Sequence, residues 1–93
     1  IVPENSRAID SADALYLRGD TDAAARAYES LLISTSNDEA LIAEIQYKLG
    51  LCYMEQRLFE QSRSVLLPLC QTATRWAIPA LVQIWLSHLR EGN

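Results

Sequence analysis

The fold is decided by two stretches that share one pattern, ALYLRGDTDAA at residues 14–24 and CYMEQRLFEQS at residues 52–62. When the two are aligned, Gly19 falls on Arg57 and Ala24 falls on Ser62. Gly92 occupies the first of these sites a third time, so that the three sites are 38 and 35 residues apart. This spacing is near the roughly 34-residue period of helix–turn–helix repeats. The sequence therefore predicts a stack of helical hairpins.

Apolar residues recur at three- and four-residue spacing along nearly the whole chain, which is typical of amphipathic helices. No stretch alternates with a period of two for long enough to predict a strand. The apolar spacing predicts five helices, over residues 6–18, 22–34, 37–56, 59–72 and 75–90. Small residues predict how paired helices cross, because Gly50 on one helix and Ala24 or Ser62 on another let two backbones approach closely.

Capping residues mark the ends of several predicted helices. Gly19 permits the left-handed backbone that closes the first helix, and either Asp20 or Thr21 can cap the second. The segment Ser36-Asn37-Asp38-Glu39 has the form of a capping box at the start of the third helix. In the fourth, Pro68 predicts a kink or an early end.

Length and composition fit one domain of an ordinary globular class. The chain has 93 residues, 49% of them hydrophobic and 22% charged, with three Gly and three Pro. This composition excludes collagen-like, low-complexity and disulfide-dense proteins. No apolar run approaches the roughly 20 residues that span a bilayer. Since the chain begins with Ile1, we expect it to be a fragment or a processed product of a longer protein.

Charge and reactive side chains argue against several functions. The net charge is −4, and the basic residues do not cluster as phosphate binding requires, so we expect no nucleic acid partner. Cys52 and Cys70 are 18 residues apart in apolar helical stretches, which favours buried free thiols over a disulfide between them. His88 is the only histidine and has no companion at metal-ligand spacing. We therefore predict no catalytic, cofactor-binding or metal-binding residues.

At this point the chain resembles the tetratricopeptide repeat (TPR) family, through Leu49-Gly50, Tyr53 and Phe59 in its second repeat. The first repeat supplies Leu15, Gly19-Asp20, Ala24 and Tyr28, and departures from the family pattern occur at Ala12, Ser36 and Arg57. The resemblance implies an all-α fold, a right-handed superhelix of stacked helical hairpins with about five helices. A single domain over residues 1–93 would hold repeats at about 5–35 and 37–73, then the first helix of a third repeat at about 75–91. Another helical-hairpin solenoid is the alternative.

The resemblance also implies a concave groove, lined by the first helix of each repeat, that binds a peptide or a helix of a protein partner. The groove residues would be Ile9, Asp13, Tyr16, Tyr47, Lys48, Leu51, Met54, Val82, Leu86 and Leu89, with Leu17 on the same face. Such a groove is apolar and aromatic, which suits a partner read by spaced apolar anchors. A clamp for acidic tails is disfavoured, because Lys48 is the one basic residue at the matching sites and Asp13 would repel a carboxylate.

These features predict a protein–protein interaction module that acts as a scaffold or adaptor in a larger protein or complex. One alternative is a chaperone that shields an apolar segment of a secretion or assembly client. Another is the accessory domain of an enzyme whose catalytic part lies outside this chain. The last helix carries Trp76, Ile84, Trp85 and Leu89, which are too apolar for an open surface. We expect a partner, or a second copy of the chain, to cover it.

Overall fold

The computed structural model describes residues 4–35, 38–72 and 75–92, with side chains from residue 9 onward. Within these ranges the chain forms five helices and no strand, so the all-α prediction is confirmed. The helices are α1 (Glu4–Leu17), α2 (Thr21–Ser34), α3 (Glu39–Glu55), α4 (Phe59–Cys70) and α5 (Ala77–Glu91). Each end lies within two residues of the boundary that the sequence predicts.

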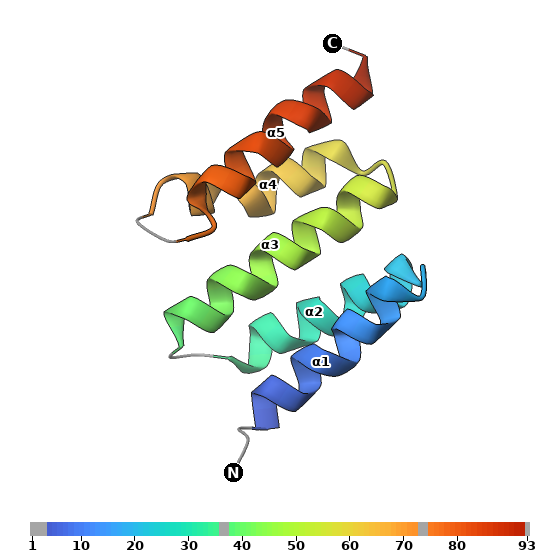
Figure 1. The fold of residues 1–93 in the computed structure, drawn as a ribbon, viewed down its shortest axis with the longest axis vertical. Helices are drawn as coiled ribbons and strands as arrows, with labels where there is room; N and C mark the ends of the chain where they lie inside the picture. Colours follow the sequence, from blue (N-terminus) through green and yellow to red (C-terminus); the bar gives the residue numbers. More distant parts are fainter. Residues whose placement is uncertain (1–3, 36–37, 73–74, 93) are drawn as a thin grey trace.

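The helices are stacked in chain order along the long axis of the molecule, with successive helices running in opposite directions (Figure 1). Each helix packs mainly against the next one, and α3 also touches α5. The molecule measures 46 × 30 × 18 Å, with α1 and α5 at opposite ends of the longest axis. The described chain is thus an elongated stack of helices.

The turns confirm the alignment of the two repeats. Among the described residues, φ is positive at Gly19 (85°), Arg57 (62°) and Gly92 (94°), the three sites that the alignment superimposes. The turn hydrogen bonds also repeat: Asp20 N donates to Leu15 O at 3.0 Å, and 38 residues later Leu58 N donates to Tyr53 O at 2.8 Å. This pattern closes a helix by satisfying carbonyls of its last turn.

Two helix starts are capped by aspartates. Asp20 accepts a hydrogen bond from Ala23 N at 3.4 Å, and Asp38 accepts one from Leu41 N at 3.1 Å. The capping box predicted from Ser36 is therefore wrong, because α3 begins at Glu39 with Asp38 as its N-cap and Ser36 lies outside the described residues. A carboxylate at this place also interacts favourably with the helix dipole. The early end predicted at Pro68 is confirmed, since α4 stops two residues later at Cys70.

The core consists of two clusters that meet at α3. The first joins α1, α2 and α3, and the second joins α3, α4 and α5 through Ala43, Leu66, Leu69 and Ala80. The thiol of Cys52 is buried in the first cluster, whereas Cys70 is partly buried, and both cysteines are free. The prediction of free thiols is confirmed.

Helices α3 and α4 approach most closely at Gly50. A Cβ atom at this position would lie 2.6 Å from Cγ of Leu66, well inside van der Waals contact. At the same crossing the Ser62 hydroxyl donates a hydrogen bond of 2.8 Å to the carbonyl oxygen of Gly50. In the first hairpin Ala12 and Ala24 are fully buried at the aligned positions. The expected role of small residues at the crossings is thus confirmed.

Candidate functional site

A cavity of about 230 Å³ lies where α1 faces α3. Four of the predicted groove residues line it, namely Asp13, Tyr16, Lys48 and Leu51. Leu17 and Tyr28 complete the lining. The sequence placed Tyr28 among the packing residues, and the only sign of another role is a polar aromatic where the second repeat has Leu66. More of the predicted groove residues meet at this cavity than at the second hollow described below.

The polar side of this cavity is a chain of hydrogen bonds between three helices. The hydroxyl of Tyr28 donates to a carboxylate oxygen of Asp13. Lys48 Nζ donates to Asp13 Oδ2 at 2.8 Å and to Glu44 Oε2 at 2.7 Å. All of these groups are partly buried, so the bonds are screened less than they would be in open water. The network fixes Lys48 between two carboxylates.

The protonation states in the network follow from these contacts. Burial, followed by the hydrogen bond to Asp13, raises the pKa of Tyr28, so the hydroxyl remains a donor. Burial alone would lower the pKa of Lys48, but its hydrogen bonds to Asp13 and Glu44 raise it overall. Lys48 therefore stays charged, and its charge is already balanced. A free carboxylate of a partner would meet no unpaired cation here.

The remaining walls of the cavity are apolar. Tyr16, Leu17 and Leu51 supply them, and burial raises the pKa of Tyr16, which keeps its hydroxyl neutral. Leu17 is 84% exposed at the mouth of the cavity, where it is free to contact another molecule. Pockets of this kind, apolar with a few fixed polar groups, are the usual form of binding sites.

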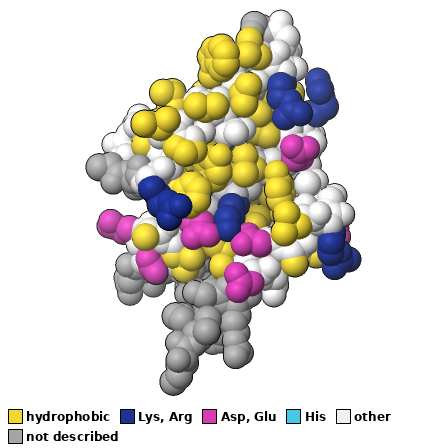
Figure 2. Space-filling model, viewed as in Figure 1, with side chains coloured by type: hydrophobic (Ala, Val, Ile, Leu, Met, Phe, Trp, Pro, Cys, Tyr) yellow, Lys and Arg dark blue, Asp and Glu magenta, His cyan; other side chains and the backbone are white. Residues whose placement is uncertain are grey.

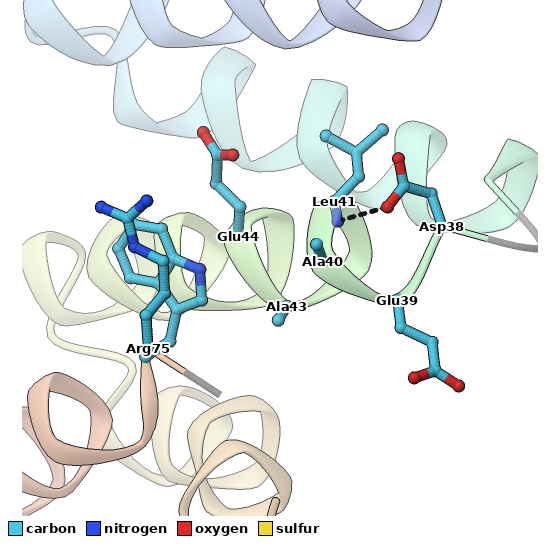
Figure 3. A pocket seen from close by; sticks show the side chains of 8 residues that line it. Asp38, Glu39, Ala40, Leu41, Ala43, Glu44 and Arg75 are labelled. Atoms are coloured by element: carbon cyan, nitrogen blue, oxygen red, sulfur yellow. Dashed lines mark hydrogen bonds between the residues drawn. The ribbon is translucent and has the colours of Figure 1, made fainter. Parts of the chain in front are cut away.

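A second hollow of about 480 Å³ lies between the start of α3 and the segment before α5. Figure 3 shows the side chains of Asp38 and Glu44 on one side of α3, with Glu39 turned the other way. Arg75 also lines this hollow, its guanidinium 4.9 Å from the centre of the Trp76 ring. This hollow has a more polar lining than the cavity between α1 and α3.

Tyr47 packs against the segment before α5. Its ring stacks on Trp76 with centroids 4.9 Å apart and an interplanar angle of 28°. Trp76 is partly buried and belongs to the second core cluster, together with Ile84. Of the four apolar residues that the sequence marked on the last helix, these two are therefore partly covered, whereas Trp85 and Leu89 are exposed.

The other predicted groove residues do not gather at the cavity. Ile9 and Met54 are buried, with 5% and 2% of their surface exposed. Leu86 is half-buried on α5, and Val82 and Leu89 are exposed there. Figure 2 shows hydrophobic side chains gathered over the α3–α5 end of the visible face and acidic side chains toward the α1 end. The face thus differs in chemistry from one end to the other.

The described residues bear on two further features, metal-ligating side chains and membrane-spanning helices. No group of three or more His, Cys, Asp or Glu side chains in residues 4–35, 38–72 and 75–92 is arranged to hold a metal ion. His88 is exposed near the end of α5. Among the described helices, none combines the length and the apolar character needed to cross a bilayer.

No protein-family model matches this chain. No curated protein and no solved structure matches it either.

Proposed function

We propose that this chain is a helical-repeat interaction module of the TPR kind, which binds a peptide or helix of a protein partner without catalysing a reaction. In this proposal the hairpins form a right-handed superhelix, and the partner lies along the face that α1, α3 and α5 share. The observation that carries the proposal is the cavity between α1 and α3, with the apolar walls of Tyr16 and Leu51 beside the fixed Asp13–Lys48 pair.

The repeated turn supports a solenoid relation between the hairpins. The left-handed backbone at Gly19 and Arg57, and the hydrogen bonds around it, recur 38 residues apart. Repeat proteins of this architecture contact only their neighbours and present an extended surface to partners. The neighbour-to-neighbour packing of the five helices agrees with that description.

The size and chemistry of the cavity indicate what it would take up. A volume of about 230 Å³ is below the 300–1,000 Å³ typical of small-molecule sites, which favours one anchoring side chain of a larger partner. The walls select an apolar anchor. An acidic tail is disfavoured because Lys48 is already bound by Asp13 and Glu44. The expected partner is an amphipathic segment with spaced apolar residues.

The experiment is a selection of displayed random peptides on the immobilised chain, followed by affinity measurements on two variants. Leu17→Asp places a charge at the mouth of the cavity, and Ile33→Asp is its matched control, since Ile33 is 87% exposed on α2 and does not line the cavity. We expect the selected peptides to share an apolar anchor and to bind Leu17→Asp about tenfold more weakly or worse. Affinity for Ile33→Asp should equal that of the unmodified chain.

Two results would contradict this proposal. One is that no peptide is enriched over the starting library. The other is that the enriched peptides bind Leu17→Asp as tightly as the unmodified chain, which would place the binding surface elsewhere.

A further inference from the structure

Helix α5 presents a stripe of large apolar side chains on the side opposite its buried face. The buried face carries two small residues, Ala80 and Ser87, which pack toward α4. The stripe consists of Ile78, Leu81, Val82, Trp85 and Leu89, each between 46% and 75% exposed. At 100° per residue these five side chains fall within an arc of about 100°, so they form one continuous surface.

The separations between four of these side chains are the same whether they are counted from the start or from the end of the helix. Ile78, Val82, Trp85 and Leu89 are separated by four, three and four residues. A second α5 that runs antiparallel about a two-fold axis would place Ile78 of one copy against Leu89 of the other. Val82 would then meet Trp85, so that every large side chain finds an apolar neighbour. Self-complementarity of this kind is what a two-fold interface between identical subunits requires.

The charges around the stripe also fit a second copy. No Asp, Glu, Lys or Arg occurs from Trp76 to Ser87, so the centre of the pair would bury no charge. The nearest charges lie beyond the two ends of the stripe, Arg75 before α5 and Arg90 and Glu91 in its last turn, and Glu91 is already paired with Arg63 of the same copy at 3.0 Å.

The area of the stripe is sufficient for a dimer. The five side chains expose on the order of 600 Å² together, so pairing that covered them completely in two copies would bury about 1,200 Å², the lower limit of specific interfaces. This surface is also at the upper limit of apolar patches on monomeric proteins. The tryptophan near its centre is the residue type most often found to dominate interface energies.

We infer that α5 is a dimer interface, through which two copies of this chain pair antiparallel about a two-fold axis that passes between residues 83 and 84. The pairing uses Val82 and Leu89, two of the predicted groove residues, and leaves the cavity between α1 and α3 open. It would cover the α5 part of the face along which the partner is proposed to lie, but no residue that lines the cavity belongs to the stripe, so Leu17→Asp and Trp85→Glu test the two proposals separately.

The first test is sedimentation equilibrium of the 93-residue chain over a range of concentrations. We expect a monomer–dimer equilibrium that Trp85→Glu weakens at least about tenfold, because the charge would be buried at the centre of the interface. Ile33→Glu is the control, an equally drastic change of an exposed apolar residue on α2, and should leave the equilibrium unchanged. A chain that stays monomeric at its highest soluble concentration overturns the inference.

The second test identifies the direction of pairing. Ile78→Lys and Leu89→Glu should each weaken the dimer, whereas the double variant should regain most of the lost affinity. The reason is that the lysine introduced in one copy then faces the glutamate introduced in the other. Positions 78 and 89 are about 16 Å apart along one helix, too far to pair within a copy. A double variant as weak as the sum of its single changes would exclude the antiparallel two-fold arrangement. Circular dichroism of each variant checks that α5 stays folded.

Discussion

The hairpin α1–α2 and the hairpin α3–α4 solve the same packing problem with different chemistry. Each crosses at a small residue, Ala12 in the first and Gly50 in the second. The first hairpin places Tyr28 against the crossing and ties its hydroxyl to Asp13. In the second, Leu66 fills the space directly over Gly50. The repeat therefore preserves the shape of the crossing. The aligned side chains differ, because Tyr28 adds a hydrogen bond to its packing whereas Leu66 only packs, and the hydrogen bond at the second crossing comes from Ser62 to the carbonyl of Gly50.

The largest expected effect follows from this difference. Leu66 is fully buried over Gly50, and Leu66→Ala would open a cavity that the backbone of α3 cannot collapse to fill. The free energy of unfolding should fall by about 2–5 kcal/mol. Urea denaturation monitored by circular dichroism measures this change.

Tyr28→Phe is the matched change in the first hairpin. It removes only the hydroxyl that donates to Asp13, and Asp13 keeps its ion pair with Lys48. The loss should be about 1.5–3 kcal/mol, the usual range for a hydrogen bond to a charged group. If Tyr28→Phe cost as much as Leu66→Ala, the first hairpin would be as dependent on a single contact as the second, and the contrast between them would fail.

An intermediate effect is expected from Cys52, whose aligned position in the first helix of the stack is far more exposed. Cys52 aligns with Ala14, which is exposed on α1, whereas Cys52 is buried on α3. Burial, then the nearby Asp13, raises the pKa of Cys52 from 9.0 to about 12. The unfolded chain loses this proton first, so the thiol's contribution to stability is complete below pH 9 and is lost as the pH rises toward 12.

The difference in the free energy of unfolding between the unmodified chain and Cys52→Ala, followed between about pH 8 and pH 10, tests this prediction. The slope of that difference should approach about 1.4 kcal/mol per pH unit, the contribution of one thiol. Tyr28 and Tyr53, whose pKa values are also raised in the folded chain, lower the stability of both proteins in this window because unfolded tyrosines ionise near about pH 10, so their effect cancels in the difference. Equal slopes for the two proteins would show that Cys52 does not carry the effect.

The smallest effect concerns the two turns. Arg57 adopts a left-handed backbone that costs a non-glycine residue about 1 kcal/mol, and Gly19 adopts it freely. Gly19→Arg should therefore destabilise the chain by about 1 kcal/mol. Arg57→Gly relieves this backbone cost but loses the contact of the guanidinium with the Phe59 ring, 5.3 Å away. The net effect should be a stabilisation of only about 0.5 kcal/mol. Thermal melts of both variants give the two signs, and a shift in the same direction for both would refute the equivalence of the turns.

Much of the fold could be predicted from local signals in the sequence. Apolar spacing located the five helices, and the alignment placed Arg57 at the turn position of Gly19, where the structure has the same left-handed backbone. The start of α3 was misplaced because Ser36 and Asp38 are both good N-caps, and local sequence does not rank them. Which of the two residues caps the helix depends on the backbone conformation just before its first turn.

The candidate site was less predictable, because it depends on contacts between helices. Lys48 joins Asp13 across 35 residues, and Tyr47 stacks on Trp76 from the segment before α5. Such pairs are set by the angle and distance at which helices cross, which periodicity within one helix does not contain. Ile9 and Met54 fell on the predicted groove face by counting along a helix, yet neighbouring helices bury them.

The packing of each helix against its neighbours also determines how this molecule comes apart. The outer helix α1 packs mainly against α2, and α5 packs mainly against α4. In contrast, α3 contacts α2, α4 and α5 and contributes to both core clusters. Structure can accordingly be lost from either end while the centre persists, and the amide protons of α3 should be the last to exchange with solvent. Contacts between adjacent helices close short loops, which favours rapid folding. The middle helix holds the two core clusters together.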